Sequence, residues 1–337
     1  MGKIVKFMFV FLLLCFVVAC QEESLSSKDD KEIPTSIQQP QNEGKPVPTV
    51  EEYSGSNDEG ELGTILIKDA RTMEVVKEIK PMELGYELIF EMYLDEIMKI
   101  AKELARGTKT TVGFDELMVL DKVDANGQII KGKPRVILNE NELVNRILAV
   151  SNSGGIVYLP IEVTESNYEL EDVPELDDIT VASFTTYFNP SQTGRNKNIE
   201  LSSAALDNII VGDGDFFSFN TMVGERSAAR GYQPAPEIIN KKRVMGIGGG
   251  ICQTSSTLFN AVDQVDVRIS ERHHHSLNVG YVPVERDATV SYGTLDFKFQ
   301  NMSGAPFLIK TFYYQNGITI EIRTARKYEG YFIVEGI

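Results

Sequence analysis

Gly246-Ile-Gly-Gly-Gly-Ile-Cys-Gln-Thr-Ser-Ser-Thr-Leu258 joins a run of glycines to a run of small polar residues. Clustered glycines let the backbone turn tightly and approach other groups closely. The residues that follow predict a helix over 255–263, with Cys252 near its first turn, where unpaired amides and the helix dipole favour a thiolate. Cys252 is therefore a candidate nucleophile. The backbone of the turn supplies the candidate binding residues Gly248, Gly249 and Gly250.

All three histidines of the chain are consecutive, at His273, His274 and His275. On a strand, His273 and His275 would share one face. Asp287 is the nearest carboxylate on the next predicted strand and could fix the imidazole tautomer. We therefore expect His275, with His273 as its substitute, to act as the base for Cys252. Gln253 and the backbone amides near Cys252 are the expected oxyanion donors.

Two other interpretations of these residues stay open. Most lone cysteines are small buried hydrophobes, so Cys252 and the histidines could belong to a structural or ligand-binding site. A thiolate and imidazoles are also zinc ligands in kind. Consecutive histidines on a strand cannot all reach one ion, so no metal is expected. A phosphate-binding loop needs a lysine after its glycines, and the glycine turn here has none. No cofactor is therefore expected.

The elements predicted around these residues are mostly strands. They are expected over 265–279, 288–292, 295–299, 307–314 and 318–322. Asn316-Gly317 between the last two is a strong hairpin signal. Upstream, a helix is predicted over 198–210, followed by a turn at 212–214 and an aromatic run at 216–219. The expected fold class is α+β, with a helix packed on a mostly antiparallel sheet over residues 179–325.

The N-terminus predicts export. Two lysines, an apolar core over 7–19 and a small residue before Cys20 are typical of a secretory signal, and this core is short for a transmembrane helix. Val17-Val-Ala-Cys20 resembles the bacterial lipobox, in which the cysteine is diacylated; an uncleaved anchor is the alternative. We expect residues 1–19 to be a lipoprotein signal peptide and Cys20 the lipidation site, which gives stable anchoring to the extracytoplasmic face of the cell membrane.

Composition limits the remaining possibilities. The 337 residues are 42% hydrophobic with a net charge of −16, which excludes a fully disordered or coiled-coil chain and argues against nucleic acid as a partner. Residues 20–61 are polar and predict a flexible stalk. Residues 62–168 predict a small α+β domain with strands at 64–68, 135–138 and 155–163 and helices at 87–106 and 140–150. Gly107 is expected to end the first helix. An acidic linker (169–178) and a C-terminal extension (326–337) complete the organisation.

Several segments resemble the VanW family, named for an accessory protein of vancomycin-resistance clusters in Gram-positive bacteria. They are Phe217-Ser-Phe-Asn220, Gly224-Glu-Arg226, Gly231-Tyr232, Gly248 to Leu258, Glu271-Arg-His273, His275-Ser276, Tyr281-Val-Pro283 and Asp287-Ala-Thr-Val290. The pattern adds Arg272 as a candidate binding residue. The chain has Val284-Glu-Arg286 where the family usually carries a glycine-arginine pair. A weaker resemblance is to the transglutaminase-like cysteine fold, which shares the order Cys, His, Asp but has a longer Cys-to-His spacing and a tryptophan after the histidine.

The family resemblance implies work at the cell envelope, with residues 62–168 where such proteins often carry a peptidoglycan-binding domain. We expect a surface lipoprotein that acts on or beside peptidoglycan. It would be either an amide hydrolase or transpeptidase that uses Cys252, His275 and Asp287, or a non-catalytic protein that binds wall peptide or a cell-wall enzyme.

Overall fold

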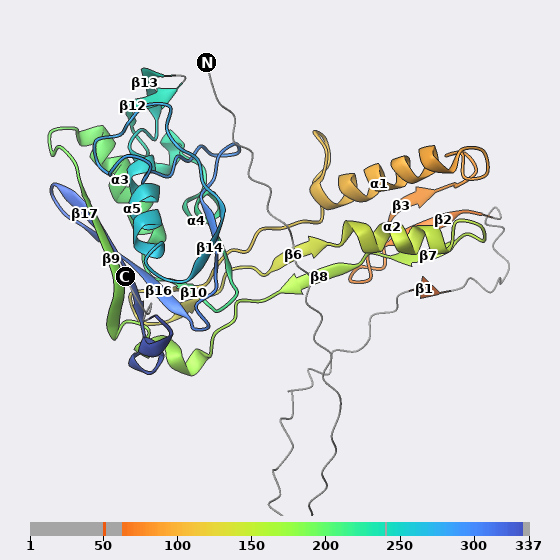
Figure 1. Cartoon of the computed structure of the whole chain (residues 1–337), viewed down its shortest axis with the longest axis horizontal. Helices are drawn as coiled ribbons and strands as arrows, with labels where there is room; N and C mark the ends of the chain where they lie inside the picture. Colours follow the sequence, from red (N-terminus) through yellow and green to blue (C-terminus); the bar gives the residue numbers. More distant parts are fainter. Residues whose placement is uncertain (1–49, 52–62, 240, 333–337) are drawn as a thin grey trace, which may run out of the picture. The chain divides into compact units, whose positions relative to one another are not determined.

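The computed structural model describes residues 50–51, 63–239 and 241–332. The predicted signal peptide, Cys20 and most of the predicted stalk lie outside the described residues. Within them the α+β class is confirmed, because mostly antiparallel sheets are packed with helices (Figure 1). No helix in this described part of the chain has both the length and the apolar character needed to cross a lipid bilayer.

The largest sheet has six strands and supports the helix that carries Cys252. Its order is β5 (Ile129–Ile130), β4 (Lys122–Val123), β10 (Ile209–Val211), β16 (Phe307–Tyr313), β17 (Gly317–Thr324) and β9 (Ile179–Tyr187), with every neighbouring pair antiparallel. Helix α5 (Ile251–Val262) packs on β9 and β17, and α3 (Thr193–Leu206) packs on β16 and α5 (Figure 1). The predicted hairpin at Asn316-Gly317 is confirmed, because Tyr313 pairs with Ile318 across it.

A smaller sheet of β11 (Phe216–Ser218), β15 (Lys298–Asn301) and β14 (Val267–Glu271) closes the other side of this core. The aromatic run predicted at 216–219 forms β11 and the start of α4 (Phe219–Val223). The Phe217 and Phe299 rings stack with their centroids 4.7 Å apart, and the Phe259 ring meets Phe297 edge-on at 5.8 Å. A hairpin of β12 (Pro234–Ile239) and β13 (Lys242–Ile247) precedes α5.

Some strands near the candidate site differ from those predicted. The strand expected over 265–279 ends at Glu271, because its partner β15 begins at Lys298, directly opposite, and the histidines have no strand to pair with. The strand expected over 288–292 is absent from the described structure, since the backbone of Ala288 bonds instead to α5 side chains. The strand expected over 295–299 begins only at Lys298. The helix expected over 198–210 ends at Leu206, and Ile209–Val211 is a strand.

Residues 50–51 and 63–164 contain a second core. Its sheet has the order β1 (Val50–Glu51), β7 (Gly155–Tyr158), β2 (Ile65–Lys68) and β3 (Val75–Ile79), and it packs with α1 (Phe90–Arg106) and α2 (Glu140–Ala149). Gly107 ends α1 with φ of 75°, as predicted. The single strand expected over 155–163 is two strands, β7 and β8 (Ile161–Thr164). Pro160 has no N–H to continue a ladder, and β8 pairs with β6 (Arg135–Leu138) instead. Residues Val50–Glu51, within the predicted stalk, pair with β7.

Residues from different predicted segments of the chain contact one another. Strands β4 and β5, from within the predicted 62–168 domain, belong to the six-stranded sheet. The predicted linker forms a 3₁₀ helix, η1 (Leu170–Glu175). Its Asp172 binds Lys327 and Tyr328 of η3 (Arg326–Tyr331), within the predicted C-terminal extension.

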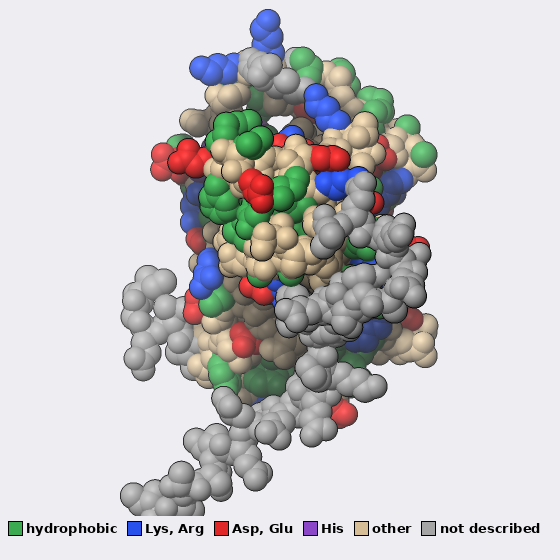
Figure 2. All heavy atoms as spheres, turned by 90° about the vertical axis from the view of Figure 1, so that its right-hand side faces the viewer, with side chains coloured by type: hydrophobic (Ala, Val, Ile, Leu, Met, Phe, Trp, Pro, Cys, Tyr) green, Lys and Arg blue, Asp and Glu red, His purple; other side chains and the backbone are tan. Residues whose placement is uncertain are grey.

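Figure 2 shows one face of the molecule, on which hydrophobic side chains reach the surface beside acidic and basic ones.

Candidate functional site

The glycine turn brings the start of α5 into close contact with its neighbours. Gly250 precedes the helix with φ of 107°, in the left-handed region, so Cys252 is the second residue of α5. A Cβ on Gly249 would lie 2.6 Å from the carbonyl oxygen of Ala235, and a Cβ on Gly250 would lie 2.7 Å from Cγ of Arg195. Both contacts are too short for a larger residue. Glycine is therefore needed here to let β12 and α3 approach Cys252.

Polar side chains of α5 hold the segment that carries Asp287. The Oγ of Ser256 accepts from the amide of Ala288 at 2.9 Å. The Nδ2 of Asn260 donates to the carbonyl of Arg286 at 2.7 Å, and its Oδ1 accepts from Nε of the same arginine at 2.8 Å. This segment has no strand partner, so the helix supplies its hydrogen bonds and fixes the position of Asp287.

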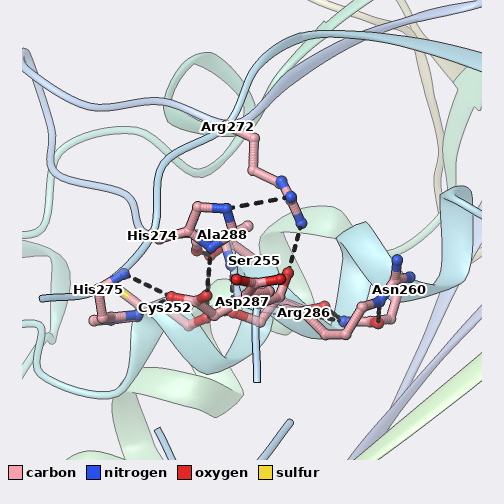
Figure 3. Close-up of polar contacts among 11 residues, drawn as sticks. Cys252, Ser255, Asn260, Arg272, His274, His275, Arg286, Asp287 and Ala288 are labelled. Atoms are coloured by element: carbon pink, nitrogen blue, oxygen red, sulfur yellow. Dashed lines mark hydrogen bonds and ion pairs between the residues drawn. The ribbon is translucent and has the colours of Figure 1, made fainter. Parts of the chain in front are cut away.

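Asp287 accepts hydrogen bonds from two consecutive histidines (Figure 3). Its Oδ2 lies 2.6 Å from Nδ1 of His275 and 2.7 Å from the backbone nitrogen of that residue, and its Oδ1 lies 2.8 Å from Nδ1 of His274. Burial alone would raise the pKa of Asp287, but these hydrogen bonds outweigh it and the pKa is lowered. Asp287 is only 6% exposed. It is an ionised, buried acceptor that orients the His275 ring.

His275 connects Asp287 to Cys252. Burial alone would lower the pKa of His275, but the hydrogen bond and charge of Cys252, followed by those of Asp287, raise the pKa. Because Nδ1 faces Asp287, the ring nitrogen left for Cys252 is Nε2. The Cys252 thiol is partly buried, lies next to His275 (Figure 3) and also donates to the carbonyl of Val290 at 3.5 Å. The structure thus brings Cys252, His275 and Asp287 into one chain of contacts.

Cys252 and His275 border a cleft of about 940 Å³, whereas Asp287 is not among the residues that line it. The cleft is lined by Cys252, His275, the turn 248–250 and residues of the β12–β13 hairpin. Three further lining residues were not singled out as site residues from the sequence: Arg195, Arg226 and Tyr281. Arg226 and Tyr281 lie in segments that carry the VanW resemblance, and that resemblance could have identified them as site residues. Arg195 carried no such signal, because its place in the cleft depends on how α3 packs on α5.

The three additional residues place hydrogen-bond donor groups in the cleft that Cys252 also lines. Burial lowers the pKa of Arg195 and of Arg226, while the charge of Cys252 acts in the opposite direction on both. Burial, and then the charge of Cys252, raise the pKa of Tyr281. The Tyr281 hydroxyl therefore keeps its proton at neutral pH, and both guanidinium groups keep their charge.

Other predicted site residues lie in different environments. Both Nε2 hydrogens of Gln253 point into the protein, toward Thr186 Oγ1 at 2.9 Å and the Tyr187 carbonyl at 3.0 Å. They are therefore not directed at a ligand. His273 faces Glu271, with 3.0 Å between Nε2 and Oε1, and does not take the position of His275. Arg272 lies outside the cleft lining, stacked 4.1 Å over the Phe259 ring and 3.3 Å from Nε2 of His274.

Among the described residues, no group of three or more His, Cys, Asp or Glu side chains is arranged to hold a metal ion. The three histidines point to different partners: Glu271, and the two oxygens of Asp287.

Comparison with known proteins identifies part of the chain. The family described as VanW like protein matches residues 194–323. The uncharacterized protein YoaR of Bacillus subtilis (strain 168) is 40% identical over 201 residues, which are 58% of this chain and 66% of that protein. The Vancomycin B-type resistance protein VanW of Enterococcus faecalis (strain ATCC 700802 / V583) is 27% identical over 117 residues, which are 33% of this chain and 42% of that protein.

These alignments leave at least a third of each relative unmatched, and no solved structure matches the chain significantly. The predicted resemblance is nevertheless confirmed over the part that contains Cys252, His275 and Asp287. Residues 194–323 are thus similar in sequence to the VanW family.

Proposed function

We propose that this protein is a cysteine-dependent amide hydrolase or transpeptidase that acts on the peptide part of peptidoglycan. The observation that carries the proposal is the position of His275. One ring nitrogen is held by the buried carboxylate of Asp287, the other is left for Cys252, and both His275 and Cys252 line one cleft. A nucleophile, a base and a group that orients the base are the parts that acyl transfer requires.

The first half of the reaction follows from this geometry. The Cys252 thiol gives its proton to Nε2 of His275, and the sulfur attacks the carbonyl carbon of an amide. The tetrahedral intermediate collapses when His275 returns the proton to the leaving amine, so the C–N bond breaks and a thioester remains. Asp287 stays ionised throughout and stabilises the imidazolium that forms.

In the second half, water or an acceptor amine attacks the thioester, and His275 takes its proton and delivers it to the departing sulfur. Water gives a carboxylate and an amine acceptor gives a new amide. The oxyanion needs a donor other than Gln253, whose amide hydrogens are engaged. The backbone amide of Cys252 lies in the first turn of α5, has no hydrogen-bond partner among the described residues, and can serve this role.

The substrate and location rest on separate observations. The N-terminal signal and the residues before Cys20 resemble those of bacterial lipoproteins, which supports anchoring through Cys20 on the extracytoplasmic face of the membrane. One relative is a vancomycin-resistance protein, and the family resemblance implies envelope work. The order Cys, His, Asp is also similar to that of the transglutaminase-like fold. Together these features favour wall peptide as the substrate.

Incubation of purified peptidoglycan with the detergent-solubilised full chain tests the proposal. We expect mass spectrometry to find either fragments that have gained one water or new amide cross-links. Cys252→Ala is expected to abolish these products, and Ser153→Ala, at an exposed loop position, is the matched control expected to leave them unchanged. Equal products from Cys252→Ala and the unmodified protein would exclude Cys252 as the nucleophile.

A non-catalytic protein that binds wall peptide is the second candidate. It is favoured by the partial burial of the Cys252 thiol and its hydrogen bond to the Val290 carbonyl, which hold the sulfur as a structural group would be held. In that case the chain would sediment with insoluble peptidoglycan, Cys252→Ala would sediment equally, and the glycan peptides would be recovered unchanged.

A further inference from the structure

The wall of the cleft contains a buried cation whose terminal nitrogens lack a hydrogen-bond partner among the described residues. Nη1 and Nη2 of Arg226 are both buried, and neither has a hydrogen-bond partner among the described residues. The guanidinium carbon lies 5.6 Å from the ring centroid of Phe219 and 5.7 Å from that of Tyr292, so aromatic rings flank it. A buried charge that lacks acceptors is costly. A ligand that supplies those acceptors would remove the cost.

Arg195, in the same cleft, shows the difference between a paired and an unpaired guanidinium. Its Nη2 donates to Oε1 of Gln253 at 2.7 Å, so the protein itself satisfies it. Arg226 and Cys252 line the same cleft, and Cβ of Arg226 would lie 3.0 Å from a Cβ on Gly248, in the glycine turn that precedes Cys252. A group bound to Arg226 would therefore lie near the sulfur.

We propose that Arg226 binds the free carboxylate of the peptide that Cys252 attacks, so that the substrate is a peptide with a free C-terminal carboxylate. This inference rests on the proposed function and names its substrate class. The planar guanidinium offers two parallel N–H groups that match the two oxygens of a carboxylate.

The other residues of the cleft favour a monoanionic peptide over a phosphate. Glu225 and Glu237 line the same cleft and would repel a dianion, whereas a single carboxylate can be neutralised by Arg226. The walls also carry apolar and aromatic side chains that suit a peptide: Phe188, Ile238, Val279, Tyr281, Val290 and Leu295.

A pair of probes that differ only at the carboxyl end tests the inference. The probes are an N-acetylated peptide of alternating L- and D-alanine with a free carboxylate, and its C-terminal amide. Calorimetry with the full chain carrying Cys252→Ala measures binding without turnover. We expect the acid to bind at least about tenfold more tightly than the amide. Arg226→Met should bring the two affinities within about twofold, because the charged hydrogen bonds are lost. Arg268→Met, at an exposed position on β14, should retain the preference.

Folding of the variants provides a second measurement. Because Arg226→Met removes a buried charge without hydrogen-bond acceptors, its melting temperature should equal or exceed that of the unmodified protein. Arg226→Lys keeps the charge without the fork and should retain a weaker preference of about threefold. Equal binding of acid and amide by the protein with Arg226 intact would overturn the inference. Competition by inorganic phosphate but not by acetate would overturn it as well.

These results separate the inference from the proposed function. A preference for the acid together with no product from peptidoglycan would support carboxylate binding and exclude catalysis. Equal turnover of acid and amide substrates, lost in Cys252→Ala, would support catalysis and exclude the role of Arg226.

Discussion

Helices α1 and α5 are both essential to their cores, but they are held in different ways. The buried residues of α1 follow one stripe: Tyr93, Ile97, Ile100, Ala101 and Ala105. Helix α5 is buried on nearly all sides, and six of its eleven buried residues are polar: Gln253, Thr254, Ser255, Ser256, Thr257 and Asn260, each at most 3% exposed. Apolar contacts tolerate small shifts, whereas hydrogen bonds fix direction and distance. The helix that carries the candidate nucleophile is the one fixed by hydrogen bonds.

The polar residues of α5 bind neighbours in several different elements. Thr257 bonds to Thr186 of β9 at 2.7 Å, and Thr254 bonds to Ser202 of α3 at 2.7 Å. Asn260 binds the segment that leads to Asp287. These contacts set the sheet, α3 and Asp287 in a fixed relation to Cys252. In α1 the polar residues mostly face solvent, so exchanging them would leave its core intact. The comparison predicts that changes in the two helices separate activity from stability.

The largest expected effect is on the chemistry. His275→Ala removes the base next to Cys252 and should lower the rate of product formation from peptidoglycan by about 10³-fold or more. Ile97→Ala in α1 should leave the rate per folded molecule unchanged. Rates measured by mass spectrometry, normalised to the folded fraction, test both variants. A loss below tenfold in His275→Ala would show that this imidazole is not the base.

The next effect is on the stability of the α1 core. Ile97 is completely buried, and Ile97→Ala should lower the free energy of unfolding by about 3 kcal/mol through lost burial and a new cavity. Met98 is the neighbouring residue on the exposed side of the helix, and Met98→Ala should change the free energy of unfolding by about 0.5 kcal/mol or less. Because the chain has no tryptophan, urea unfolding is best followed by circular dichroism. Equal losses in the two variants would contradict the one-sided burial of α1.

A smaller loss of stability is expected in α5, with a disproportionate loss of activity. Asn260→Ala leaves the carbonyl and Nε of Arg286 without their partner and should cost about 2 kcal/mol. Because the same contact holds the segment of Asp287, the rate should fall as well, unlike in Ile97→Ala. Combining Asn260→Ala with Arg286→Met should cost less than the sum of the two changes. Strict additivity, with full activity retained, would show that this contact does not position Asp287.

The sequence was sufficient for α1 and insufficient for the surroundings of α5, and the comparison explains why. Apolar periodicity and Gly107 predicted α1, because burial of one stripe is a local property of the sequence. Cys252 at the start of a helix could also be predicted, since the glycines mark the turn. The strand expected over 288–292 was wrong because the backbone of Ala288 bonds to the side chains of Ser255 and Ser256. Such partners are distant in sequence and leave no periodic signal.

The same reason limits the prediction of the site. Gln253 follows Cys252 and was a natural oxyanion donor, but its amide is used by β9. The choice between His273 and His275 depended on where β14 ends, which is set by its pairing with β15. The role inferred for Arg226 depends on two nitrogens that packing leaves buried without a hydrogen-bond partner among the described residues. Unsatisfied groups are properties of packing and cannot be read from a single sequence.

The smallest expected effect is a pH dependence confined to α5 and its contacts. Although burial opposes it, Cys252 and Asp287 raise the pKa of His275 above that of the unfolded chain. Protonated His275 therefore stabilises the fold fully below about pH 6.5, and this contribution is lost as the pH rises through the folded pKa. The unfolding free energy of the unmodified protein minus that of His275→Gln should be larger at pH 5.5 than at pH 8. Asp287, whose pKa is lowered, stays ionised across this window.

Ile97→Ala is the control. The unfolding free energy of the unmodified protein minus that of Ile97→Ala should be the same at both pH values, because the α1 core contains no titrating partner of Ile97. A difference for His275→Gln that grows with pH would show that the neutral imidazole is the stabilising form, and that Cys252 and Asp287 do not share its proton in the way the contacts indicate.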